Sequence, residues 1–221
     1  SMHREMRAFH KVRFYRTDMQ GVADSLVFAT KDSCLTLYKD PILWNQNQQL
    51  VGEKVCIYFN DSTIERAHII NQALSVEQID STKYNQVSGK EMKSYFRNKQ
   101  MYKTEVIGSV RVVYYPMDAD STLIGMNVSE TSKLDVYLEN QKLEKMVMSP
   151  KSSGTLYPMT QIPAGKDKLD NFVWFEYIRP KNKQDIFNWV PKKVTDQLKK
   201  SVRGPIELPN QHLFENKKKE E

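Results

Sequence analysis

The sequence of 221 residues is poor in the groups that build catalytic and metal sites. It has two cysteines and four histidines, and the histidines are scattered without the spacing of zinc ligands. It also lacks a glycine-rich phosphate loop, a nucleophile elbow and a helix-borne histidine pair. Asp118 and Asp120 are close in sequence, but such a pair is more typical of a solvated turn than of an acid and a base. We therefore predict a protein that is not an enzyme and that holds no metal or cofactor.

Long apolar runs are missing too, so no segment predicts a helix that spans a bilayer. No signal peptide is evident, but Ser1-Met2 resembles a cloning remnant and strand-like sequence follows almost at once. These features predict that the chain is cut from a longer one, so the missing signal says little about location. Cys34 and Cys56 are too few for a disulfide framework. One bridge between them stays open as an alternative, and two unpaired thiols are favoured.

What the sequence does contain is a pattern that repeats about every 40 residues, as in stacks of like units. Three stretches begin near Gly52, Gly89 and Glu130, and in each of them apolar and polar residues alternate. The two-residue period is typical of a strand with one buried face. Each stretch continues into a polar corner and a second alternating run, which contains a three-residue step that predicts a bulge. The corners lie at residues 60–62, 97–99 and 139–141. Residues 73–78 and 110–115 are predicted to be connecting strands between the units.

The apolar positions of the three units predict a trough lined by two arms, because bent strand pairs that stack leave their apolar faces toward a shared hollow. A closed sandwich with a plain core is the alternative. Methionine suits loosely shaped apolar guests, so we predict a site for acyl chains. The predicted lipid-binding residues are Val55, Ile57, Phe59, Ile64, Ile69, Met92, Phe96, Met101, Val106, Leu134, Val136, Leu138, Leu143, Met146 and Met148. The basic residues expected at the rim, where they would meet anionic head groups, are Lys54, Arg66, Lys90, Lys93, Lys103, Lys142 and Lys145.

The periodicity divides the chain into three segments. Residues 1–11 are predicted to be a flexible start, residues 12–187 the β repeats with a C-terminal cap, and residues 188–221 a short irregular or helical tail. The apolar run Phe172–Tyr177 is interpreted as a final strand or as a plug over an open end of the stack. The net charge of +6 permits an anionic partner, but the basic residues are spread along the chain and nucleic-acid binding is not expected.

Several short motifs, taken in their order, resemble the OstA-like family, which includes LptA and the periplasmic part of LptD. The resemblance spans roughly Val12 to Phe187. The motifs that carry it are Gln20-Gly21-x-Ala23-Asp24-Ser25-Leu26, Leu35-Thr36-Leu37-Tyr38-x-x-Pro41-x-Leu43-Trp44, Gly52-x-x-Val55-x-Ile57-Tyr58-Phe59-Asn60, Gly154-Thr155-Leu156-Tyr157-Pro158, and Arg179-Pro180 with Asp185-Ile186-Phe187.

The resemblance implies an all-β fold of stacked bent antiparallel strands, an open-ended, taco-like β-jellyroll. It also implies a non-enzymatic periplasmic module, with an association with the outer membrane, that carries lipopolysaccharide or another acyl lipid between the membranes of Gram-negative bacteria. The implied partners are other Lpt-type β-jellyrolls that pair through edge strands, with head-to-tail self-association as a further expectation. A structural β-repeat scaffold without lipid cargo is the alternative, and an enzyme of polysaccharide metabolism is the least favoured reading.

Overall fold

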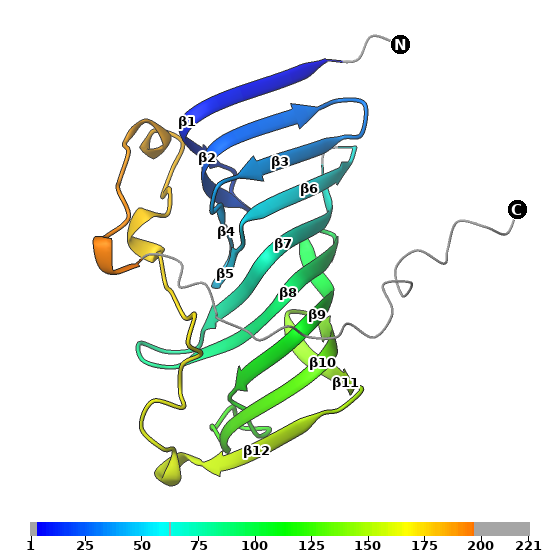
Figure 1. Ribbon diagram of the computed structural model, residues 1–221, viewed down its shortest axis with the longest axis vertical. Coiled ribbons are helices and arrows are strands. Elements are labelled where there is room, and N and C mark those ends of the chain that lie inside the picture. Colours follow the sequence, from blue (N-terminus) through cyan, green and yellow to red (C-terminus); the bar gives the residue numbers. More distant parts are fainter. Residues whose placement is uncertain (1–3, 62, 197–221) are drawn as a thin grey trace, which may run out of the picture.

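The computed structural model describes residues 4–61 and 63–196, and within them twelve strands join in one antiparallel sheet. The strands are β1 (Glu5–Tyr15), β2 (Gln20–Ala29), β3 (Cys34–Tyr38), β4 (Ile42–Asn45), β5 (Gln48–Val51), β6 (Lys54–Asn60), β7 (Thr63–Gln78), β8 (Tyr84–Arg97), β9 (Gln100–Tyr114), β10 (Gly125–Glu139), β11 (Lys142–Ser149) and β12 (Ser153–Pro158). Short 3-10 turns follow at Met159–Gln161, Glu176–Ile178, Asp185–Phe187 and Val194–Asp196. The predicted all-β fold of stacked, bent antiparallel strands is confirmed (Figure 1).

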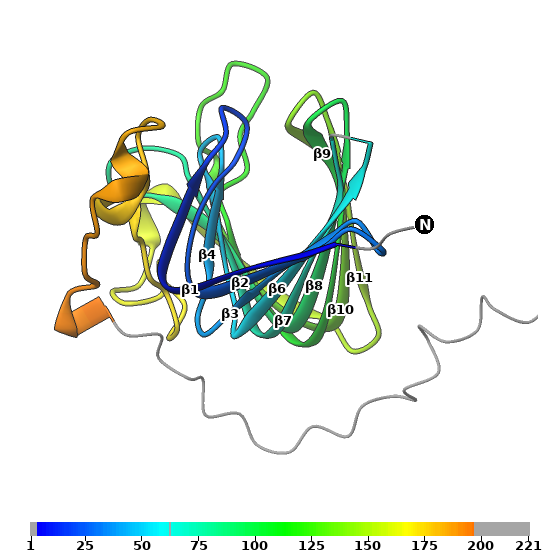
Figure 2. The ribbon, with the colours of Figure 1, turned by 90° about the horizontal axis from the view of Figure 1, so that it is seen from above.

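The long strands are bent in the middle, and the bends align from strand to strand into one crease. In β7 the bend falls at Asn71 and Gln72, and in β9 at Gly108 and Ser109, all four of which have positive φ angles. The pairing register shifts at the same places, as it does between Ile70 and Ala73. Extra residues in a ladder bend the strand that carries them. The crease therefore folds the sheet into a trough, and Figure 2 looks along it from one end.

The crease divides the sheet into two walls. Wall A consists of residues 5–9, 25–29, 34–38, 54–60, 63–70, 91–97, 100–107, 133–139 and 142–149. Wall B consists of residues 12–15, 20–23, 42–45, 48–51, 73–78, 84–89, 110–114, 125–131 and 153–158. The runs at 73–78 and 110–115 were expected to be separate connecting strands, but they continue β7 and β9 beyond the crease.

The polar corners and bulges that the repeat predicts are present at the free rim of wall A. Asn98 and Lys99 both have positive φ angles, as do Asn140 and Gln141, so each pair forms a tight two-residue hairpin turn. Two residue pairs away from each corner the pairing register shifts, between Tyr95 and Phe96 in one hairpin and at the equivalent places in the other two. The three-residue step in the sequence is therefore the signature of a bulge.

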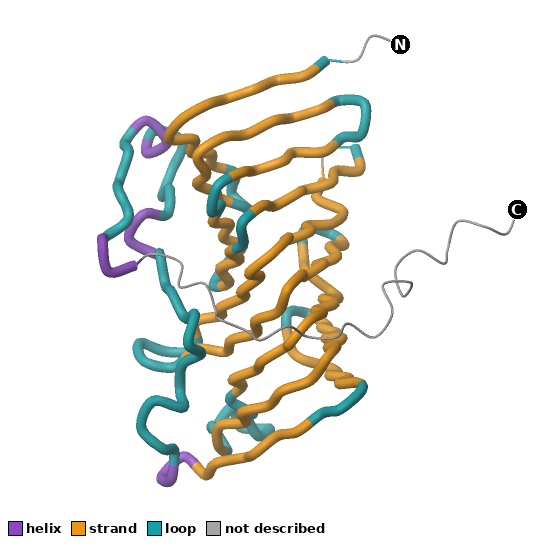
Figure 3. The backbone as a smooth tube through the Cα atoms, in the orientation of Figure 1, coloured by secondary structure: helices purple, strands orange, loops and turns teal. Residues whose placement is uncertain are grey.

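Residues 159–196, which we call the strap, run back along the outer face of wall B (Figures 1 and 2). The strap consists of loops and 3-10 turns, whereas the walls are strand throughout (Figure 3). Its Val173, Phe175 and Ile178 pack in a buried cluster with Trp44 and other outward-facing residues of wall B. We expected a final strand or a plug over an open end of the stack in this part of the chain. Instead, its buried apolar side chains pack against the outer face of wall B.

Three buried glutamines of wall B hold the strap. Gln49 donates from Nε2 to the Val173 carbonyl oxygen (2.9 Å) and accepts from the Phe175 amide at Oε1 (2.7 Å). Gln86 binds the Asp167 carbonyl and the Leu169 amide in the same way, at 2.8 Å each. Gln20 accepts from the Arg179 guanidinium at 2.7 and 2.9 Å. A carboxamide has both a donor and an acceptor, so it can satisfy strap backbone that no strand pairs.

The ends of the chain differ from the expected segments. Strand β1 begins at Glu5 rather than at Val12, because residues 5–9 extend wall A and the positive φ angles of His10 and Lys11 form the bend of this strand. Residues 188–196 belong to the strap and include the turn at Val194–Asp196. The rest of the expected tail, 197–221, and residues 1–3 lie outside the described residues.

Candidate lipid-binding trough

The inner face of wall A is apolar from one end of the stack to the other. Next to the crease, each strand contributes one apolar side chain to a row in which neighbours are paired directly. This row consists of Ala8, Leu26, Leu37, Val55, Ile69, Met92, Val106, Leu134 and Met148. A parallel row nearer the rim is also apolar except for Ser94 and Thr104, whose hydroxyls lie 3.0 Å apart and bond to each other. Wall A therefore presents a continuous surface for an apolar guest or for a core.

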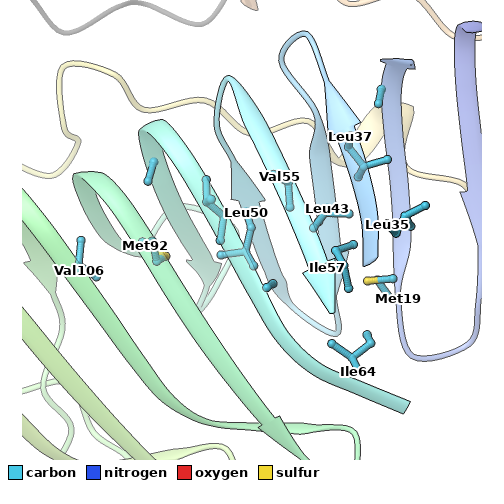
Figure 4. Close-up of a cluster of buried hydrophobic side chains, with 14 of the residues drawn as sticks. Met19, Leu35, Leu37, Leu43, Leu50, Val55, Ile57, Ile64, Met92 and Val106 are labelled. Carbon is cyan, nitrogen blue, oxygen red and sulfur yellow. The ribbon is translucent and has the colours of Figure 1, made fainter. Parts of the chain in front are cut away.

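In the half of the trough formed by β1–β6 and by the wall A part of β7, residues 63–70, the facing walls fill the space themselves. Val55 and Ile57 of wall A are fully buried, and Leu43 and Leu50 of wall B pack in the same cluster. Figure 4 shows these side chains gathered between the walls, with Met19 beside Ile57. Gly21 contributes by its small size, since a Cβ at this position would lie 2.3 Å from the Phe14 ring. This part of the trough, which we call the filled half, is an ordinary close-packed core.

In the half formed by β7–β11, the walls enclose a pocket of about 470 Å³. This volume is in the range of about 300–1,000 Å³ that small-molecule sites occupy. The pocket, in what we call the open half, is lined by Gln48, Ser75, Glu77, Asn85, Val87, Met92, Met101, Thr104, Val106, Tyr114, Tyr115, Met117, Asp118, Ala119, Ser121, Val136, Leu138, Gln141, Lys142, Leu143 and Met146. Residues 116–124 form the rim of wall B here and face the hairpin turns of wall A across the mouth (Figure 2).

The two walls of the pocket differ in chemistry. Wall A provides methionines and aliphatic side chains, whereas wall B provides a polar row along its rim. In that row Gln48 donates from Nε2 to the Ser75 hydroxyl at 2.9 Å. The carboxylate of Glu77 accepts from the Asn85 amide at 3.0 Å and from the Asn47 amide at 3.3 Å. Burial, with the nearby Glu77 carboxylate as a second cause, raises the pKa of Tyr114. The pocket is therefore amphipathic.

The structure brings together only part of the predicted lipid-binding set. Seven predicted residues line the pocket: Met92, Met101, Val106, Val136, Leu138, Leu143 and Met146. Five pack in the apolar cluster of the filled half: Val55, Ile57, Phe59, Ile64 and Ile69. Phe96, Leu134 and Met148 also pack in this cluster without lining the pocket. All fifteen face the inside of wall A. The strands after the corners, which were expected to form the second arm of the trough, therefore lie in the same wall as the strands before the corners.

The basic residues expected at the rim lie elsewhere, with one exception. Lys142 lines the mouth of the pocket. Arg66 and Lys103 lie on the outer face of wall A, where the Arg66 guanidinium is 4.2 Å from the Tyr58 ring centroid and the Lys103 ammonium is 5.4 Å from that of Tyr137. Strand alternation explains the difference, since these residues flank the inward-facing positions. Arg66 and Lys103 thus take part in cation–π contacts on the outer face rather than in the mouth.

Sequence reasoning missed the whole polar wall of the pocket. Ser75, Glu77, Asn85 and Tyr114 lie on the strand halves beyond the crease, which were interpreted as connections between units. The available signal was the alternation after Asn71, where Ala73, Ser75 and Glu77 share one face. Recognition of the crease would have placed that face opposite the methionines of wall A.

Within 4–61 and 63–196 no cluster of histidine, cysteine and carboxylate side chains is suited to a metal ion. Cys34 and Cys56 are free thiols on the outer face, with the Thr36 hydroxyl 3.7 Å from the first sulfur and 3.9 Å from the second. Burial raises the pKa of Cys34, which lowers its thiolate fraction and its reactivity. In the described part of the chain, no helix has the length and apolar character needed to cross a membrane.

Of the comparisons with known proteins, only the one with solved structures gives a match. No protein-family model matches the sequence, and no curated protein matches it either. Among solved structures, the chain is similar to the crystal structure of LptH, described as the LptA homologous periplasmic component of the conserved lipopolysaccharide transport device from Pseudomonas aeruginosa. The identity is 15%, the TM-score is 0.44, and the match covers 60% of this chain and 95% of that one.

Proposed function

We propose that the protein is a non-enzymatic lipid carrier that takes an acyl chain into the open half of its trough. The observation that supports this most is the pocket of about 470 Å³ with the methionines and valines of wall A along one side. Burial of an alkyl chain against such a wall is favourable in proportion to the apolar area removed from water. Methionine side chains adapt to guests of loose shape. The polar row of wall B would keep the less apolar part of the lipid oriented.

The cargo that we propose is lipopolysaccharide or a related acyl lipid, moved between the inner and outer membranes. This part of the proposal, together with a periplasmic location and an association with the outer membrane, is supported by the OstA-like motifs of the sequence. The seven predicted residues that line the pocket would contact the chain, and the five of the filled half would support the wall behind it.

Edge strands are the proposed route to other β-jellyrolls and to a second copy of this chain. Within the described residues β1 pairs only with β2, and β11 only with β10, so each end of the stack offers a strand edge. Such edges template further strands. We expect concentration-dependent self-association in analytical ultracentrifugation. A species that stays monomeric at the highest attainable concentration would contradict the proposal.

A scaffold without lipid cargo is the second candidate, and the filled half favours it. There the trough is a core and needs no guest. The two candidates differ only in the open half, so a test must act there.

The experiment fills the pocket. Fluorescently labelled lipopolysaccharide is titrated against the protein and against Val136→Trp, whose indole would occupy the space beside Met146. We expect a loss of affinity of at least about tenfold, or 1.4 kcal/mol. The control is Val147→Trp on the outer face of the same hairpin, which should bind like the unmodified protein. Equal binding by all three proteins would favour the scaffold.

A further inference from the structure

Glu77 gives the pocket a negative charge that a plain acyl-chain site would not need. It is half-buried on the inner face of wall B, and the described residues form no ion pair with it. The other charged lining residues are Asp118 in the rim loop and Lys142 at the start of β11. The protein as a whole carries a net charge of +6. The pocket therefore has two acidic side chains and one basic side chain, although the molecule is basic.

The carboxylate of Glu77 is held in place by its neighbours. Asn85 donates from its amide to one oxygen at 3.0 Å, and Asn47 donates to the other at 3.3 Å. Asn85 is itself fixed, because its carbonyl oxygen accepts from the backbone N–H of Tyr115 at 2.9 Å. A carboxylate can accept about four hydrogen bonds, so about two acceptor sites remain for a ligand. A fixed acceptor with spare capacity is suited to a donor from the pocket.

Tyr114 supplies a second recognition element beside this carboxylate. It lines the pocket, and burial together with the nearby charge of Glu77 raises its pKa, so the phenol remains neutral. Aromatic rings bind ammonium groups through cation–π contacts, which are stronger where the groups are shielded from water. Across the pocket, Met101, Val136 and Met146 offer the apolar surface on which an attached chain would lie.

We propose that the open half selects an amphiphile whose single alkyl chain carries an amine, with the ammonium group at Glu77 and Tyr114 and the chain along wall A. This inference rests on the proposed lipid-binding function and specifies which head group enters the pocket. An anionic phosphate or sulfate head would face Glu77 and Asp118 with only Lys142 to offset them, so a lipid with such a head leaves that group outside the mouth.

The test uses matched twelve-carbon probes below their micelle concentrations: dodecylammonium, which has N–H donors, dodecyl sulfate and uncharged dodecyl maltoside. Displacement of a fluorescent fatty acid measures their affinities for the intact chain. We expect the ammonium probe to bind at least about fivefold more tightly than the sulfate, as a charge-assisted contact predicts. The basic net charge of the protein would produce the opposite order if binding were non-specific.

Two variants assign the preference to the site. Glu77→Gln keeps the size of the side chain and one of its two amide contacts, and it should reduce the ammonium preference to below about twofold while maltoside binding stays unchanged. Glu144→Gln, which removes an exposed carboxylate outside the pocket, should leave the preference intact. Sulfate binding equal to or tighter than ammonium binding, or an unchanged preference in Glu77→Gln, would overturn the inference. Absence of binding by all three probes, or binding that Val136→Trp leaves unaltered, would instead overturn the proposed function.

Discussion

The filled half and the open half of the trough share one construction and differ in what wall B contributes. Wall A carries the same apolar row through both halves. In the filled half, wall B contributes Leu43 and Leu50, which pack against wall A and fill the space between the walls. In the open half the paired row continues with the smaller side chains of Ser75, Val87 and Val112. Ser75 and Val87, together with the polar side chains around Glu77, line the pocket. A bent sheet therefore becomes a core or a pocket according to the residues on one of its two faces.

The largest effect is expected where the space is filled. Leu37→Ala removes a fully buried side chain of the filled half and should lower the free energy of unfolding by about 2–5 kcal/mol, because a cavity is left in a packed core. Leu143→Ala makes the same chemical change in the open half, where the side chain is half-buried, and should cost about 1 kcal/mol or less. Urea unfolding of both variants measures the contrast. Equal costs would mean that the two halves are packed alike.

The strap should support both halves to a similar degree, since it crosses wall B along its length. Gln49→Leu leaves the Val173 carbonyl and the Phe175 amide without their partner, and we expect a loss of about 2 kcal/mol. Gln86→Leu, the matched change behind the open half, should cost about as much. Neither variant should alter lipid binding, because both glutamines point away from the pocket. Weaker binding in Gln86→Leu alone would show that the strap shapes the pocket.

A substitution in the open half should mainly weaken ligand binding, whereas one in the filled half should mainly lower stability. Met146→Trp occupies the pocket and should weaken binding of a fluorescent fatty acid at least about tenfold, with little change in the unfolding midpoint. Ile57→Trp overpacks the filled half and should lower the free energy of unfolding by about 1–3 kcal/mol. At temperatures where that variant remains folded, its lipid affinity should be unchanged. If Ile57→Trp weakened binding and Met146→Trp did not, the binding site would lie in the filled half and the account would be contradicted.

The smallest effect concerns pH and separates stability from binding. His68 lies on the outer face of wall A at the boundary of the halves, and burial holds its pKa below the ordinary value although the bond to Glu91 opposes this. The native state then binds this proton less readily than the unfolded state. The contribution to stability is thus present above the ordinary pKa of about 6.5 and is lost as the pH falls through it.

Between pH 7.5 and 5.5 the unfolding midpoint should therefore decrease more in the unmodified protein than in His68→Gln, by an amount equivalent to less than about 1 kcal/mol. Fatty-acid affinity should not change over this interval. An identical pH profile for the two proteins would contradict the assignment.

Much of the fold was predictable because local chemistry determines it. The corners at Asn98 and Asn140 and the bulges behind them follow from turn preferences and from the spacing of apolar residues. The crease was missed since it depends on non-glycine residues such as Gln72 and Ser109 in a backbone region that their types do not favour. Stacking with neighbouring strands, rather than local preference, holds them there.

The site was half predictable for a related reason. The inward positions of wall A follow from strand alternation, and Met92, Val136 and Met146 were identified in this way. Whether such a residue is core or pocket depends on the residue that faces it from wall B, which is distant in sequence. The strap shows the same limit, because the apolar run Phe172–Tyr177 indicates burial but not the surface against which it is buried.

The most direct test of the account maps where an acyl chain lies. A fatty acid with a diazirine at the end of its chain is bound and photolysed, and the labelled residues are located by mass spectrometry. The account predicts labels on β8–β11, at residues such as Met92, Met101 and Met146, and none on Leu37 or Val55. Labels of similar intensity along the whole of wall A, or on the strap, would contradict it.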